Sequence, residues 1–139
     1  FLTKGMEEQL QKMKHRHEVI FTGRLSPEEL NQVLGSAWAM TFVPHFEGFG
    51  IPLVEAMRCD LPLIASNVTS LPEVAGDAAI YAEPDSPGSI RDAMIRLVKE
   101  EGLRDQLVEK GRKRKELYSW DNTARELWKT IEKLMGEHA

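Results

Sequence analysis

A short apolar run, a bend rich in glycine and a helix start follow one another directly in the middle of the chain. Residues 39–43 are largely apolar and end at Pro44, a pattern that predicts a strand covered on both faces. Gly48 and Gly50 come next, and glycine accepts positive φ and presents no Cβ to a ligand. Pro52 suits the first turn of a helix, where its missing N–H is no loss. The stretch therefore predicts a strand that leads through a glycine bend into a helix.

The same alternation of short apolar runs and amphipathic segments continues along the chain. Strands are expected at residues 19–21, 39–43, 63–65 and 78–81. Helices are expected to begin near Met6, Ser26, Ile51, Ser70, Ser86, Leu103 and Trp120. Alternation at this spacing predicts an α/β fold with a Rossmann-like parallel sheet and helices on both faces.

Serine side chains mark several of these helix starts. Ser26 and Glu29 have the spacing of a capping box, and Ser70 and Glu73 repeat it. Ser86 precedes another amphipathic segment as a candidate N-cap. We expect each serine to accept a hydrogen bond from the first turn of its own helix.

Composition limits the classes of partner and compartment. The chain has 139 residues, which suits one domain, and its formal net charge of -4 favours neither nucleic acid nor anionic membrane. Cys59 is the single cysteine, so no internal disulfide is possible and a cytoplasmic location is expected. No segment is apolar for long enough to span a bilayer, and no signal-peptide pattern opens the chain. The first residue is Phe1, and we expect the chain to be a fragment of a longer polypeptide.

Polar turns follow the expected strands, where parallel sheets bind their ligands. Residues 22–25, 44–50 and 66–69 all fall at such carboxyl ends. A helix that opens at about Ile51 or Pro52 directs free N–H groups and the positive end of its dipole toward the glycine bend. The sequence therefore predicts an anion site here, with phosphate as the expected ligand.

Residues 46–57, Leu61 with Pro62, and residues 71–74 carry a resemblance to a known family. They are similar to the nucleotide-sugar-binding half of GT-B-fold retaining glycosyltransferases, of the family-4 or group 1 type. The similarity covers nearly the whole chain, and Glu47 and Glu55 with seven residues between them match its E-x7-E motif. The resemblance implies that residues 1–139 are a truncated C-terminal donor-binding domain, without the N-terminal acceptor domain.

The resemblance implies roles for the motif residues. Glu55, expected in the first helical turn, would accept hydrogen bonds from both ribose hydroxyls. Glu47, the implied catalytic residue, would contact the transferred sugar and stabilise positive charge on its ring. Backbone N–H groups in the donor-binding stretch would hold the sugar and the diphosphate. That stretch comprises Gly48, Phe49, Gly50 and Ile51. The alternative is that Glu55 only complements the helix dipole and Glu47 is a solvated loop residue.

Other polar residues near the expected strand ends are weaker donor-binding candidates. The family often places the nucleobase or its phosphate near the position of Arg24. The guanidinium would stack on the base or form a forked pair of hydrogen bonds with the phosphate. The alternative is that Arg24 is a surface arginine. His45 adjoins the motif and offers a hydrogen bond to phosphate or sugar. Ser66, Asn67 and Thr69 offer hydroxyl or backbone contacts, and Glu73 is expected to cap its own helix.

The implied function is transfer of a hexose from a nucleoside diphosphate sugar to a glycan or lipid acceptor, with retention, as in polysaccharide biosynthesis. No D-x-D pair occurs, so no metal and no cofactor are expected. The expected partners are the donor and, through the missing domain, the acceptor. Peripheral membrane association of the full-length protein stays open, and nucleic acid is not an expected partner. The isolated fragment is expected to bind nucleotide weakly and to transfer nothing.

Several alternatives remain beside this interpretation. Another GT-B enzyme such as a nucleotide-sugar epimerase, or a non-enzymatic flavodoxin-like binding or receiver module, has a similar element order. Glycoside hydrolysis by the two glutamates is disfavoured because no apolar pocket is evident to raise a pKa. His15 and His17 are expected to be exposed, and the basic run 110–115 to be a solvated helix face.

Two more residues or segments carry expectations. Asp60 stands where the family commonly has glycine, and aspartate tolerates the left-handed conformation moderately well. The last helix carries Trp120, Leu127 and Trp128 on one side, which is most simply core. In the family this helix reaches back toward the other domain, so part of the stripe is expected to lack its partner.

Overall fold

A computed structural model describes residues 2–136, which form two units. The first unit is Phe1–Leu30 and the second is Asn31–Ala139. The expectation that residues 1–139 form a single domain stays a prediction.

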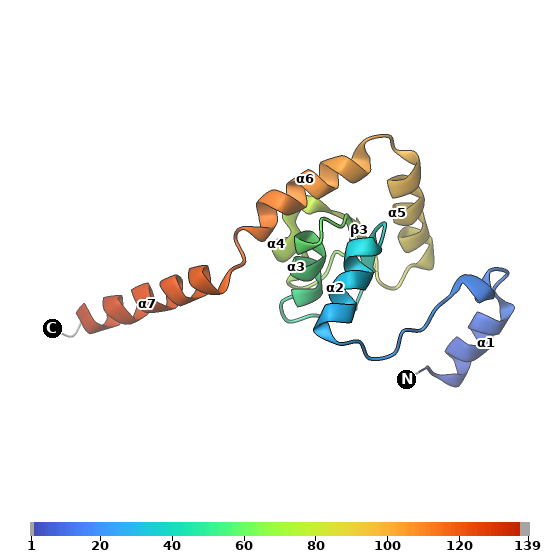
Figure 1. The fold of residues 1–139 in the computed structure, drawn as a ribbon, viewed down its shortest axis with the longest axis horizontal. Helices are drawn as coiled ribbons and strands as arrows, with labels where there is room; N and C mark the ends of the chain where they lie inside the picture. The colour runs from blue at the N-terminus through green and yellow to red at the C-terminus, as the bar shows by residue number, and fades with distance from the viewer. Residues whose placement is uncertain (1, 137–139) are drawn as a thin grey trace. The chain divides into compact units, whose positions relative to one another are not determined.

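A parallel sheet forms the centre of the second unit (Figure 1). Its strands are β1 (Met40–Phe42), β2 (Leu63–Ser66) and β3 (Ala79–Ala82), in the spatial order β1-β2-β3. The register pairs Met40 with Leu63, and Leu63 with Ala79. Every residue of β2 is buried although successive side chains point to opposite faces, so both faces of the sheet are covered. The predicted α/β fold with a Rossmann-like parallel sheet is confirmed.

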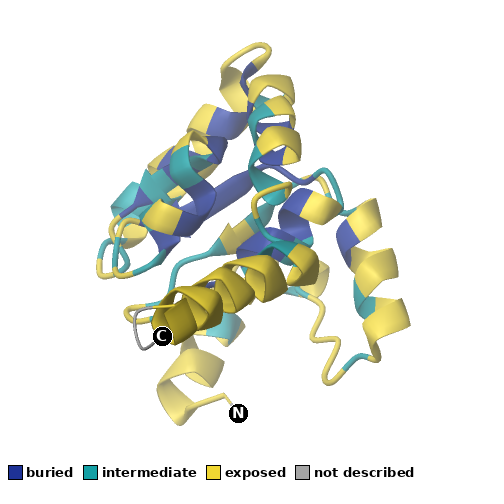
Figure 2. Ribbon diagram, turned by 90° about the vertical axis from the view of Figure 1, so that its left-hand side faces the viewer, coloured by how far each residue is buried: buried dark blue, intermediate teal, exposed yellow. Residues whose placement is uncertain are grey.

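Helices connect and follow the strands. They are α3 (Ile51–Arg58) between β1 and β2, α4 (Leu71–Ala75) with η2 (Gly76–Ala78) between β2 and β3, then α5 (Pro87–Lys99) and α6 (Leu103–Lys115). One buried cluster joins the strands to α5 and α6 through Ile64, Ile80, Ala82, Ala93, Leu97, Leu103 and Leu107. Leu53, Met57 and Leu71 of α3 and α4 are also fully buried. Figure 2 shows the buried residues in dark blue. These helices begin within one residue of their predicted starts.

The last helix, α7 (Trp120–Gly136), has no buried residue. Trp120 is 88% exposed, and Leu127 and Trp128 are 61% and 60% exposed. The prediction that this stripe is core is therefore wrong for the described residues. The faces of the sheet are already filled by side chains of α3 to α6, so α7 adds nothing to that core.

The first unit contains α1 (Lys4–Lys12), the 3-10 turn η1 (Arg16–Glu18) and the start of α2 (Pro27–Ser36). The capping box at α2 is confirmed: the Ser26 N–H donates to Glu29 Oε2 at 2.8 Å, and the Glu29 N–H donates to Ser26 Oγ at 3.2 Å. The strand predicted at residues 19–21 is wrong. No described strand pairs with this segment, and Ile20 is 82% exposed, so its apolar character does not place it in a sheet.

Among residues 2–136, no helix combines the length and the apolar character needed to cross a membrane.

Candidate functional site

The loops after the three strands meet at the carboxyl edge of the sheet. The Ser66 hydroxyl, at the end of β2, donates to the carbonyl of Pro44 after β1 at 2.7 Å. Asn67 Nδ2 donates to Glu83 Oε1 at 2.6 Å, which joins the loops after β2 and β3. The prediction that residues 44–50 and 66–69 lie at one edge is confirmed by these contacts.

Gly50 is the N-cap of α3 and has the left-handed conformation, with φ 99°. A Cβ built at Gly50 would lie 2.6 Å from Leu71 Cδ2, so both the conformation and the space require glycine. Gly48 differs, because its φ is not among the positive ones and a Cβ there would meet nothing within 4 Å. The reason for glycine that the sequence suggested therefore applies to Gly50 and not to Gly48.

The N-terminus of α3 opens toward this edge without a side-chain cap. The helix begins at Ile51, with Pro52 as its second residue, as predicted. Gly50 has no side chain to accept from the first N–H groups, and the first turn contains no acidic residue. The positive end of the helix dipole is therefore not complemented by the helix itself, which suits an anionic ligand.

Glu55 lies one turn into α3 and not in its first turn, so that part of the prediction is wrong. The alternative that Glu55 only complements the helix dipole fails for the same reason, since the dipole effect falls off within the first turn. Its side chain is half-buried and shares a helix face with Ile51, four residues earlier. Within residues 2–136 the carboxylate has no hydrogen bond or ion pair.

Glu47 is held through its backbone by the loop after β2. Its N–H donates to Thr69 Oγ1 at 3.3 Å, and its carbonyl accepts from Ser70 Oγ at 3.0 Å. Its side chain is half-buried, and the carboxylate has no hydrogen bond or ion pair within the described part of the chain. Glu47 is therefore a loop residue whose backbone is held in place and whose carboxylate is unpaired among the described residues, so the alternative that it is a solvated loop residue stays open.

Thr69 and Ser70 hold this loop in a way that the sequence did not reveal. Thr69 has φ 52°, an uncommon conformation for a β-branched residue. The capping box predicted for Ser70 and Glu73 is wrong, since α4 has no side-chain cap and the Ser70 hydroxyl donates to Glu47 instead. The signal in the sequence was a pair of hydroxyl residues after a strand, which local spacing misassigned to a helix start.

Phe49 contacts Tyr118, which lies just after the end of α6. Its ring meets the Tyr118 ring edge-on, with the centroids 5.7 Å apart and an interplanar angle of 86°. The Tyr118 hydroxyl donates to the Val74 carbonyl at 3.0 Å, and Arg114 Nε donates to the same carbonyl at 2.9 Å. Arg114 also donates to the carbonyl of Glu73. Sequence reasoning missed Tyr118 and Arg114, because both contacts join segments far apart in the chain.

His45 and Arg24, the other two donor-binding candidates, differ in their positions. His45 is 70% exposed, and its Nδ1 lies 3.4 Å from Asp85 Oδ1 in the loop after β3. It therefore lies at the carboxyl edge, as predicted. Arg24 belongs to the first unit and follows Gly23, which has φ 66°, in a segment that contains no strand. Its expected position at a strand end is wrong.

Asp60, after the other end of α3, has φ 56° and is held by α6, so the left-handed conformation expected there is confirmed. Arg112 Nη2 lies 2.8 Å from one carboxylate oxygen, and Lys115 Nζ lies 3.3 Å from the other. The hydrogen bond from Arg112, with help from Lys115, holds the pKa of Asp60 below its ordinary value. Part of the basic run 110–115 is therefore paired with Asp60 in the turn after α3, and is not simply a solvated helix face.

A cavity of about 380 Å³ lies near the amino ends of the strands, lined in part by Ala37, Leu61 and Asp60. The charged groups Asp60 and Arg112 in its lining are paired with each other. This cavity therefore offers fewer free polar groups than the carboxyl edge, where Glu47 and Glu55 are unpaired. The chemistry favours the carboxyl edge as the candidate site.

Comparisons with known proteins agree with this fold and motif. Residues 2–114 match the family described as "Glycosyl transferases group 1". The O-antigen chain mannosyltransferase B of Escherichia coli is 33% identical over 102 residues, which are 73% of this chain and 27% of that protein. The MMP alpha-(1->4)-mannosyltransferase of Mycolicibacterium hassiacum is 33% identical over 119 residues, 83% of this chain and 29% of that protein.

The solved structure of sucrose-phosphate synthase from Thermosynechococcus elongatus has the same fold over 95% of this chain and 34% of its own, with a TM-score of 0.81 and 24% identity. The chain spans about a third or less of the length of each of these proteins. The family match covers more than half of the chain and includes both glutamates of the motif, the glycine bend and α3. The chain therefore belongs to the glycosyl transferases group 1 family.

Proposed function

We propose that this chain forms the donor-binding part of a retaining glycosyltransferase. In the full-length enzyme it binds a nucleoside diphosphate sugar, whose hexose is transferred to a glycan or lipid acceptor. The observation that carries the proposal is the pair Glu47 and Glu55, half-buried beside the uncapped start of α3 and unpaired within residues 2–136. The carboxylate oxygens of both residues are accessible rather than buried, so they are free to accept hydrogen bonds from a ligand with several hydroxyl donors.

Each part of the donor has a matching group in this proposal. The diphosphate lies at the start of α3, where N–H groups and the helix dipole favour negative charge. Glu55 accepts from the vicinal ribose hydroxyls, and ionised oxygens form strong hydrogen bonds with such donors. Glu47 accepts from hydroxyls of the sugar.

The same groups act on the reaction. As the glycosidic bond breaks, the sugar ring gains positive charge and the diphosphate gains negative charge. The carboxylate of Glu47 stabilises the first, and the N–H groups that begin α3 stabilise the second. Glu47 remains in place because its N–H and carbonyl are both bonded to the loop after β2.

The relatives suggest which sugar to test first. Both curated proteins described above are named mannosyltransferases, so a nucleoside diphosphate mannose is the first donor to test. We also propose that transfer requires no metal ion, since the sequence has no D-x-D pair. The reaction is proposed to occur in the cytoplasm, on an acceptor held outside this chain.

Titration of the full-length protein with UDP, GDP and ADP tests the proposal. One nucleotide is expected to bind, and Glu55→Ala is expected to weaken that binding because the ribose loses its acceptor. Glu101→Gln is a matched control, since this glutamate is exposed and lies at the turn between α5 and α6. If no nucleotide binds, or if Glu55→Ala binds as tightly as Glu101→Gln, the ribose role fails.

A further inference from the structure

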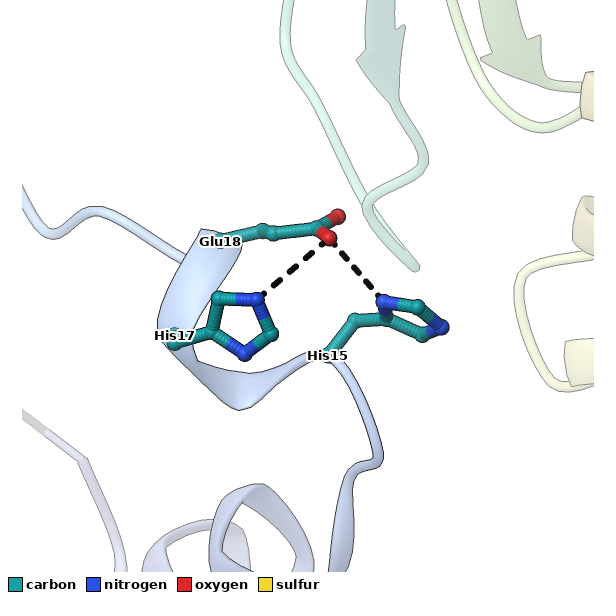
Figure 3. Close-up of side chains that lie close together, drawn as sticks. All are labelled: His15, His17 and Glu18. Atoms are coloured by element: carbon teal, nitrogen blue, oxygen red, sulfur yellow. Dashed lines mark hydrogen bonds and ion pairs between the residues drawn. The ribbon is translucent and has the colours of Figure 1, made fainter.

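Two histidines and a glutamate converge at the turn η1 in the first unit. His15 Nδ1 lies 3.0 Å from Glu18 Oε1, and His17 Nε2 lies 3.6 Å from the same oxygen (Figure 3). The three ligand atoms are all within 4.8 Å of one another. This convergence is local, because the 3-10 turn Arg16–Glu18 brings residues two and three positions apart onto one side.

The separations suit a single metal ion. Bonds from zinc to histidine nitrogen or carboxylate oxygen are about 2.0–2.2 Å long, so neighbouring ligand atoms in a tetrahedron lie about 3.3–3.6 Å apart. The two separations from Glu18 Oε1 are close to this range.

The surroundings leave the three groups available. The side chains of His15, His17 and Glu18 are 60%, 77% and 64% exposed. Arg16, which stands between the histidines in sequence, donates to the Val19 carbonyl at 3.2 Å, and its guanidinium lies 5.6 Å from the Phe21 ring centroid. Arg16, the cation between the two histidines, is therefore held by other partners.

We propose that His15 Nδ1, His17 Nε2 and Glu18 Oε1 form a surface site for a late first-row divalent metal ion, with water in the remaining positions. Two imidazole nitrogens and one carboxylate oxygen suit Zn²⁺, Ni²⁺ or Cu²⁺, whereas Mg²⁺ and Ca²⁺ favour oxygen ligands. The site uses none of the residues of the proposed donor site. It is an addition to the proposed function and does not depend on it.

Calorimetric titration of the chain with ZnCl₂ tests the site. We expect binding of one Zn²⁺ that MgCl₂ does not reproduce. Replacing both histidines (His15→Ala with His17→Ala) is expected to lower the Zn²⁺ affinity at least about tenfold, and Glu18→Gln is expected to lower it less. Arg16→Ala is the matched control within the same turn and is expected to keep the affinity. Other histidines, such as His45 and His138, are present in every variant, so their contribution cancels.

A second readout separates ligation from folding. Co²⁺ in place of Zn²⁺ is expected to give visible absorption bands that the double histidine variant loses, while its circular dichroism stays that of the unsubstituted chain. Unchanged Zn²⁺ affinity in the double variant, or equal loss in Arg16→Ala, overturns the proposal. Nucleotide titration of the same variants in the full-length protein is expected to be unaffected, so a failure here is distinct from a failure of the donor site.

Discussion

The carboxylates around α3 differ in whether they have a partner within the fold. Glu47, which precedes the helix, and Glu55, one turn into it, have no partner among the described residues, although the Glu47 backbone is bonded on both sides. After the end of α3, Asp60 is paired with Arg112 and Lys115. The charge of Asp60 is matched within the fold, whereas the accessible carboxylates of Glu47 and Glu55 are free to accept hydrogen bonds from a ligand. The contrast locates the candidate site at the start of α3.

The largest expected effect is a loss of activity when the charge of Glu47 is removed. Glu47→Gln in the full-length enzyme should lower hexose transfer by about 100-fold or more, since a neutral amide stabilises positive charge poorly. Its free energy of unfolding should change by less than about 0.5 kcal/mol, because no interaction within the described residues is lost. Steady-state kinetics and urea unfolding measure the two effects. If Glu47→Gln keeps the rate of hexose transfer, the Glu47 carboxylate has no role in the reaction and the proposed difference from Asp60 is wrong.

The backbone that carries the free carboxylates should be sensitive to Gly50→Ala. The new Cβ meets Leu71 Cδ2 and the residue must keep φ near 99°, so the expected loss of stability is about 1–3 kcal/mol. Thermal unfolding measures this loss. Gly48→Ala is the matched control and should change little, since its Cβ enters open space. Equal losses for the two variants would show that the bend is not held as described.

The contact between Phe49 and the end of α6 can be separated into two parts. Tyr118→Phe removes the hydroxyl that donates to the Val74 carbonyl and should cost about 0.5–1.5 kcal/mol. It keeps the ring that meets Phe49, so nucleotide binding by the full-length protein should be unchanged. Tyr118→Leu removes both and should also weaken nucleotide binding. Equal nucleotide affinity in the two variants argues against a role for the ring in positioning the loop.

Breaking the ion pairs of Asp60 with Arg112 and Lys115 should have the smallest effect, and that effect should be on stability alone. Because the pKa of Asp60 is lowered from 3.8 in the folded state, its stabilisation is present at neutral pH and is lost as the pH falls below about 4. Asp60→Asn should therefore cost no more than about 1 kcal/mol at pH 7, since the pair is partly exposed, and less at pH 3. Urea unfolding at both pH values measures the difference. A cost that is the same at pH 3 contradicts the assigned cause.

Two of the confirmed predictions rest on short-range interactions. The capping box of Ser26 and Glu29 and the cap from Ser86 to the Ser89 N–H each join residues three apart, so the sequence contains both partners. Two of the wrong predictions depended on a distant partner. Residues 19–21 have the composition of a strand but no neighbouring strand among the described residues, and Ser70 has the spacing of a cap but donates to Glu47. Local spacing cannot distinguish these outcomes.

The sequence by itself determined the alternation of strands and helices, the glycine bend before α3 and the spacing of Glu47 and Glu55, because periodicity and helix starts depend on neighbouring residues. Only the tertiary structure decided that the loops after β1 and β2 share hydrogen bonds, that Tyr118 supports Phe49 and that Asp60 is paired while Glu47 and Glu55 are not. These contacts join residues far apart in the chain, and the packing of α3, α4 and α6 beside the sheet brings them together.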